Sequence, residues 1–106
     1  VASWANESVY TDQSYDSLEE LTDFLLEEEG WTLEKLLSFR SGLLDKADAL
    51  ETTYNYYQQE EYLEHLGKGH RRVIEGHVKI IYRIDREHIY IIDFFDFRQD
   101  PEKMKG

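Results

Sequence analysis

The sequence predicts an α+β fold in which an N-terminal strand and a two-helix hairpin pack on a small, mainly antiparallel β-sheet. Two observations carry this prediction. Leucines recur at helical spacing over residues 18–50. Over residues 70–98, apolar β-branched and aromatic residues form three runs separated by short polar turns. A chain of 106 residues is expected to form one domain, spanning residues 1–106.

The first expected elements are a short strand at residues 1–4 and a helix that begins at Ser17. Ser17 and Glu20 have the spacing of a capping box, in which each side chain bonds the other residue's amide. Behind them one apolar stripe repeats at helical spacing, and Gly30 is expected to stop the helix. The stripe consists of Leu18, Leu21, Leu25 and Leu26.

A second helix is expected after Thr32, which can cap it. Gly42 lies inside this helix and costs up to about 1 kcal/mol relative to alanine, so a bend is possible there. The two helices should form an antiparallel hairpin with one leucine face. The second helix contributes Leu33, Leu36, Leu37, Leu43, Leu44, Ala47 and Leu50 to that face.

Residues 52–66 give the weakest pattern, because four tyrosines are scattered among glutamine and glutamate. These tyrosines could pack over the sheet or form a protein interface, which we favour over an aromatic platform for nucleic-acid bases. They are Tyr54, Tyr56, Tyr57 and Tyr62. Gly67 and Gly69 then break the chain before the strands.

Three strands are expected at residues 70–74, 77–84 and 89–97. If Arg86 and Glu87 form a two-residue loop, Ile84 lies opposite Ile89 and Lys79 lies opposite Phe94. In this register the core face carries Val78, Ile80, Tyr82, Ile84, Ile89, Ile91, Phe95 and Phe97. The other face carries His77, Lys79, Ile81, Arg83, Tyr90, Ile92, Phe94, Asp96 and Arg98.

The net charge of −11 is unevenly distributed. Residues 1–64 hold 16 acidic and 3 basic side chains, whereas residues 65–106 hold 7 and 9. The overall acidity argues against general nucleic-acid binding, which depends on a basic field. It leaves room for a local basic site and would suit a cationic peptide partner.

The absence of cysteine excludes disulfides and thiolate metal sites, which fits a cytoplasmic protein. No apolar run approaches the roughly 20 residues needed to cross a bilayer, and the first residues do not resemble a signal peptide. The four histidines lack metal-ligand spacing, and no phosphate-binding loop or nucleophile motif is present. We therefore expect no metal, no cofactor and no membrane contact.

The remaining candidate site is a basic set on the predicted strands. Guanidinium and ammonium groups there could hold phosphates or stabilise an RNA-cleaving transition state, with His70 transferring protons. Equally, these cations could pair with Glu75, Asp85, Asp93 and Asp96 nearby in sequence. The set consists of Lys68, His70, Arg71, Arg72, Lys79, Arg83 and Arg98, and Arg98 is expected beside Lys79.

The order of two helices, HLGKGHRR, KIIYRID and FDFRQDP resembles the RelE/ParE superfamily of type II toxin–antitoxin toxins. The RQDP ending at residues 98–101 favours the ParE-like, "plasmid stabilisation" branch. The resemblance implies a small cytoplasmic toxin that inhibits growth and forms a hetero-oligomer with a cognate antitoxin. An antitoxin segment is expected to cover Tyr90, Ile92 and Phe94, exposed beside the cations.

The resemblance implies two alternative activities. ParE-like members inhibit DNA gyrase, whereas RelE-like members are endoribonucleases that cut mRNA on the ribosome. For the ribonuclease, the implied catalytic residues are His70, Arg72, Lys79 and Arg98. Binding roles are expected, whichever activity holds, for Lys68, Arg71, Arg83, Tyr90 and Phe94. Lys79 stands where arginine is usual, and Met104 stands where RelE enzymes have a tyrosine. A third alternative is an inactive member that serves as a protein-binding module.

Overall fold

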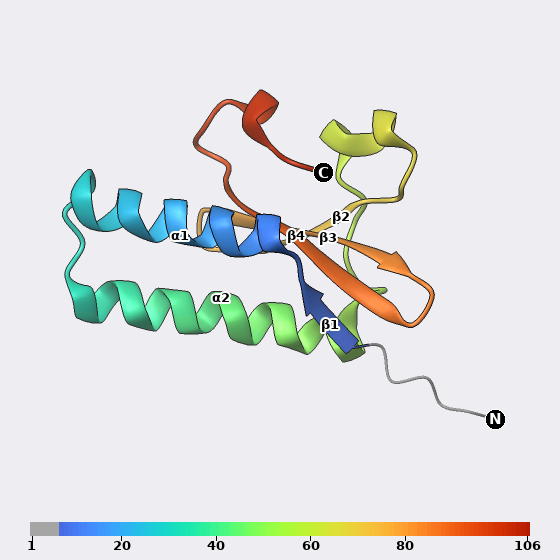
Figure 1. Ribbon diagram of the computed structural model, residues 1–106, viewed down its shortest axis with the longest axis horizontal. Helices are drawn as coiled ribbons and strands as arrows, with labels where there is room; N and C mark the ends of the chain where they lie inside the picture. The colour runs from blue at the N-terminus through green and yellow to red at the C-terminus, as the bar shows by residue number, and fades with distance from the viewer. Residues whose placement is uncertain (1–6) are drawn as a thin grey trace.

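The computed structural model describes residues 7–106 and has the predicted α+β architecture. Strand β1 (Glu7–Tyr10) leads into helices α1 (Asp12–Glu27) and α2 (Leu33–Thr53), which lie antiparallel and side by side (Figure 1). Three strands follow: β2 (Arg71–Glu75), β3 (Val78–Asp85) and β4 (His88–Asp96). Two 3₁₀ turns, η1 (Glu61–Leu66) and η2 (Pro101–Lys103), flank this strand region in sequence.

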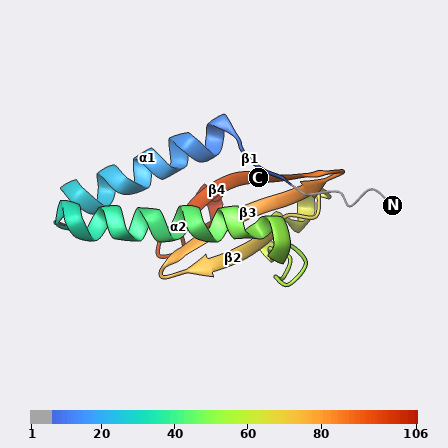
Figure 2. The ribbon, with the colours of Figure 1, turned by 90° about the horizontal axis from the view of Figure 1, so that it is seen from below.

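The strands form one sheet in the order β1-β4-β3-β2. Strand β1 runs parallel to β4, and the other neighbours are antiparallel. The expected strand at residues 1–4 lies outside the described residues, but an N-terminal strand is present at β1. Figure 2 shows α2 running along the sheet, which places the helical hairpin over one sheet face.

Helix α1 begins earlier than predicted, so the assignment of Ser17 as N-cap was wrong. Thr11 is the N-cap, and its Oγ1 accepts a hydrogen bond from the Ser14 amide at 3.1 Å. Ser17 is buried in the helix, where its hydroxyl accepts a bond from the Phe94 amide at 2.9 Å. The capping-type residue thus satisfies a backbone donor of β4, a partner far away in sequence.

The hairpin connection and the start of α2 agree with the sequence. Gly30 follows the end of α1 with φ +66°, a left-handed conformation that favours glycine. Thr32 caps α2 and accepts the Lys35 amide at 3.1 Å. The single leucine face was only partly right, because Leu26, Leu33 and Leu37 are exposed to solvent.

The core between helices and sheet is built from both predicted patterns. Leucines of α1 and α2 pack against alternate residues of the strands. The buried sheet residues in this core are Val73, Val78, Ile80, Tyr82, Ile89, Ile91 and Phe94. Tyr82 also donates its hydroxyl to the carbonyl of Tyr54 at 2.7 Å, and burial raises the pKa of Tyr82 to about 12.

The predicted pairing of Ile84 with Ile89 is confirmed, but that of Lys79 with Phe94 was wrong. Tyr82 pairs with Ile91, and the preceding Ile81 pairs with Asp93, so Ile92 is an extra residue in β4. Such a bulge reverses the two faces for every residue after it. Phe94 therefore lies in the helix-facing core rather than on the opposite face.

The opposite face of the sheet carries a second small core, which the sequence did not predict. Ile81, Ile92 and Phe95 are buried there against Leu63 of η1 and Met104 after η2. Figure 1 shows these two 3₁₀ turns close together and away from α2. Phe95 was assigned to the helix-facing core with Phe97, but it faces the other way, and Phe97 is partly exposed.

We expect Ile81→Ala to lower the free energy of unfolding by about 2–5 kcal/mol, because the truncation opens a cavity in the second core. Urea denaturation measures the change. Ile74→Ala in β2 is the matched control, because Ile74 is 51% exposed, and it should cost about 0.5 kcal/mol or less. Similar losses in both variants would contradict the second core.

Candidate functional site

Three cations of the predicted basic set meet on the sheet face opposite the helices, here called the distal face. Arg72 pairs with Ile81 and Ile74 pairs with Lys79, so Arg72 and Lys79 project to the same side. Arg83 lies on this side too, opposite Tyr90. The structure thus brings Arg72, Lys79 and Arg83 together on one face of the sheet.

A glutamate that the sequence analysis missed, Glu60, lies between these cations. One carboxylate oxygen accepts a hydrogen bond from Lys79 Nζ at 2.9 Å and lies 3.5 Å from an Arg72 nitrogen. The other oxygen accepts the Tyr62 amide at 3.0 Å. Glu60 itself is 2% exposed. The Glu60 carboxylate is therefore a buried anion, and it is bound by two of the cations that the sequence suggested as phosphate ligands.

The charge of Glu60 is stabilised by this arrangement. Burial alone would raise its pKa, but the hydrogen bonds from Lys79 and the Tyr62 amide and the nearby positive charges outweigh burial. The net result is a pKa below the usual value for glutamate. Glu60 was missed because it lies in the weakly patterned stretch before η1, where it is also the N-cap.

The arginines of the set also make polar contacts with other groups. Arg72 donates further bonds to the Gln59 carbonyl at 2.8 Å and to the Gln58 side chain at 3.1 Å. Arg71 donates to the Tyr57 carbonyl at 2.9 Å. Arg83 lies 3.7 Å from an Asp85 oxygen and over the ring of its strand neighbour Tyr90. Lys68 is exposed.

His70 lies at the start of this face but is only 2% exposed. Within residues 7–106, neither ring nitrogen has a hydrogen-bond partner. Burial lowers the pKa of His70, and the positive charges of Arg83 and Lys68 lower it further. The imidazole is thus kept away from solvent, so His70 would have to become exposed before it could exchange a proton with a bound substrate.

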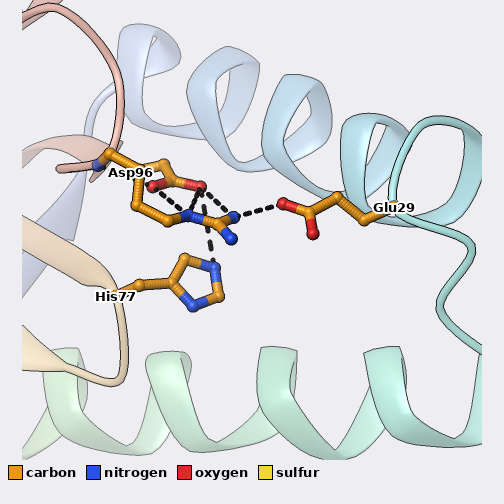
Figure 3. Close-up of polar contacts among 4 residues, drawn as sticks. Glu29, His77 and Asp96 are labelled. Atoms are coloured by element: carbon orange, nitrogen blue, oxygen red, sulfur yellow. Dashed lines mark hydrogen bonds and ion pairs between the residues drawn. The ribbon is translucent and has the colours of Figure 1, made fainter.

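Arg98 was expected beside Lys79, and that placement was wrong. Its guanidinium donates a hydrogen bond to the Asp96 carboxylate at 2.6 Å and forms an ion pair with Glu29, two residues beyond α1, also at 2.6 Å. Figure 3 shows Asp96 and His77 reaching from the strand ends toward Glu29 of the α1–α2 connection, with α1 above and α2 below. Asp96 pairs with Val78, a residue of the helix-facing core, whereas Lys79 points to the distal face.

The Arg98 cluster holds the end of β4 against the helical hairpin. The hydrogen bonds from Arg98 and its positive charge outweigh burial and lower the pKa of Asp96. His77 lies 3.6 Å from Asp96 and stacks on Phe39 of α2. Asp96 was considered as an ionic partner from the sequence, whereas Glu29 was missed because it is distant in the chain.

The exposed apolar patch expected at Tyr90, Ile92 and Phe94 is not formed. Ile92 is 6% exposed and Phe94 is 3% exposed, and only Tyr90 is half-buried. The bulge and the second core account for this difference. No group of three His, Asp or Glu side chains within residues 7–106 is placed to hold a metal ion. In the same range no helix is long and apolar enough to cross a membrane.

Comparisons with known proteins support the fold. No protein-family model matches the sequence, and no curated protein matches it. The chain is similar to one in the solved structure titled "Chromosomal ParDE TA system from P. aeruginosa", with a TM-score of 0.71 and 17% sequence identity. The match covers 89% of this chain and 98% of that chain. The predicted ParE-like resemblance is therefore confirmed for the fold.

We expect Glu60→Gln to lower the free energy of unfolding by about 1–3 kcal/mol at pH 7, because Arg72 and Lys79 lose their shared anion. The folded state lowers the pKa of Glu60. The ionised carboxylate therefore stabilises the fold fully above its pKa in the unfolded state, about 4.3. This contribution is lost as the pH falls through its pKa in the folded state. The difference from the wild type should shrink at pH 3. Urea denaturation at both pH values measures it.

The matched control is Glu61→Gln, which removes the exposed neighbouring carboxylate. This variant should stay within about 0.5 kcal/mol of the wild type at pH 7. A Glu60→Gln effect equally small at pH 7 would show that the ion pairs contribute little to stability.

We expect acid to destabilise the fold through His70. Its pKa is lower in the folded state, so below about pH 6.5 the unfolded state takes up the proton more readily. His70→Leu should reduce the loss of stability between pH 7 and 5, by at most about 1.4 kcal/mol per pH unit. Thermal unfolding across this range measures the slope. A slope in His70→Leu equal to that of the wild type would contradict the assignment.

Proposed function

We propose that this chain is the toxin component of a type II toxin–antitoxin pair in the cytoplasm and that it inhibits growth through a protein target such as gyrase. The observation that carries the proposal is the fold shared with a chain of the ParDE system over 89% of this sequence and 98% of that one. The GKGHRR, YRID and RQDP segments, in the order typical of ParE-like toxins, support it independently.

The charges favour a protein target over RNA cleavage. Arg72 and Lys79 are held by Glu60, and Arg98 is held by Asp96 and Glu29 on the other side of the sheet. A polyanion would have to displace these carboxylates and would approach a chain with a net charge of −11. The catalytic roles of His70, Arg72, Lys79 and Arg98 therefore stay tied to the alternative ribonuclease function.

A cognate antitoxin is the expected partner and would form a hetero-oligomer with this chain. Its contact surface must differ from the one predicted, because Ile92 and Phe94 are buried by the chain itself. Tyr90 and Arg83 stay partly exposed on the distal face, near the turn between β3 and β4, where they are available for contacts.

We expect induction of this chain alone to arrest growth and leave mRNA intact in primer extension. Co-expression of the product of the neighbouring gene should restore growth. The purified chain should inhibit supercoiling by gyrase at least tenfold more strongly than Ile81→Ala, the variant expected to be poorly folded. Lys79→Ala and Arg72→Ala should each keep inhibition within about threefold, or 0.7 kcal/mol, provided that they fold.

Codon-positioned mRNA cuts that disappear in Lys79→Ala would replace this proposal with the ribonuclease. Growth arrest with intact mRNA and uninhibited gyrase would contradict the gyrase assignment and leave another protein target. Normal growth with a stable antitoxin complex would leave only the binding module.

A further inference from the structure

A cavity of about 650 Å³ lies between α1, the end of β4 and the segment that follows β4. Glu20, Leu21 and Phe24 line it from α1, and their spacing places them on one face of that helix. Figure 1 shows the segment after β4 on the side of α1 that faces away from α2. None of the described residues that line the cavity belongs to the basic set of the strands. The volume is in the range of sites for small molecules.

The floor of this cavity is apolar apart from one buried carboxyl group. Phe94 and Phe95 line it as buried side chains, and Asp93 beside them is 3% exposed. One Asp93 oxygen accepts a hydrogen bond from the Lys105 amide at 3.0 Å. Burial raises the pKa of Asp93, and the negative charge of Glu20 raises it further, against the hydrogen bonds that lower it. A cation placed between these two carboxyl groups would relieve their repulsion.

The mouth of the cavity carries charges of both signs. Glu20 on α1 is exposed, and so are Lys103 and Lys105 on the segment after β4. Within residues 7–106, none of these three side chains takes part in an ion pair. Asp96 also lines the cavity, but its charge is neutralised by Arg98. The cavity thus has an acidic wall and a basic wall whose charges do not pair with each other.

We propose that this cavity binds a free aromatic α-amino acid. The ammonium group of the ligand would lie between Glu20 and Asp93, and its carboxylate would pair with Lys103 or Lys105 on the opposite wall. Its ring would pack on Phe24 at the mouth and on the phenylalanines of the floor. A residue inside a peptide is a poorer occupant, because its backbone lacks both charges. The site goes beyond growth inhibition, and binding to the purified chain is measured independently of toxicity.

The probes are L-phenylalanine and L-tryptophan, titrated into the full chain by isothermal titration calorimetry. We expect saturable binding with a Kd of about 1 mM or lower, as is typical of ligands of this size. Two analogues of phenylalanine each lack one charge: phenethylamine has no carboxylate, and 3-phenylpropanoate has no ammonium group. Each analogue should bind at least tenfold more weakly than phenylalanine, because one wall of the cavity then stays unpaired.

Two pairs of variants on α1 test the acidic and the aromatic wall. Glu20→Gln should weaken the binding of phenylalanine at least fivefold, whereas Glu19→Gln is the matched control. Glu19 is an equally exposed carboxylate outside the cavity lining, so this control should stay within about twofold of the wild type. Phe24→Ala should weaken binding at least fivefold, whereas Leu26→Ala, at a similarly exposed position outside the lining, should leave the affinity unchanged.

The basic wall is tested by Lys103→Gln combined with Lys105→Gln. This double variant should bind phenylalanine no more tightly than phenethylamine, because the carboxylate of the ligand has lost its partners. A melting temperature measured for each variant shows that lost binding does not come from unfolding.

The absence of saturable binding for both amino acids would overturn the proposal. Phenethylamine that binds the wild type as tightly as phenylalanine would overturn the zwitterion and assign the cavity to a simple organic cation. Equal affinities of Glu20→Gln and Glu19→Gln for phenylalanine would place the ligand elsewhere on the chain.

Discussion

The register of β3 against β4 shifts by one residue between the Tyr82–Ile91 and Ile81–Asp93 pairs, and the composition of both sheet faces depends on this shift. Before it, alternate residues of β4 point to the helices as in a regular strand. After it, Phe94 enters the helix-facing core and Phe95 enters the second core. The bulge thus supplies apolar residues to both cores from one short segment.

The same shift separates the basic residues. Asp96 is turned toward the helices, where it holds Arg98 together with Glu29. Lys79 stays on the distal face, where Glu60 holds it. Four cations of the set, Arg72, Lys79, Arg83 and Arg98, are each paired with a carboxylate, whereas Arg71 bonds a carbonyl and Lys68 is exposed. These ion pairs explain how much of the positive charge of the strand region is used inside the fold.

Much of the negative charge that forms no internal ion pair lies on helix α1. Helix α1 is held to the sheet by its leucines and by Ser17, while its acidic side chains face solvent. The same hairpin exposes Leu26, Leu33 and Leu37. It therefore combines exposed apolar side chains with negative charge on its solvent-facing surface. The strand region, which the sequence marked as the binding surface, is the more completely covered part of the molecule.

The sequence alone determined the fold class, the helical hairpin with its cap at Thr32, and the Ile84–Ile89 end of the strand hairpin. These features depend on local periodicity, capping and turn residues, which are readable over a few neighbours. Only the tertiary structure decided the bulge at Ile92 and the role of Glu60. A bulge depends on how two strands fit around a core, and the Glu60 contacts join residues 12–19 positions apart, so neither leaves a local pattern in the sequence.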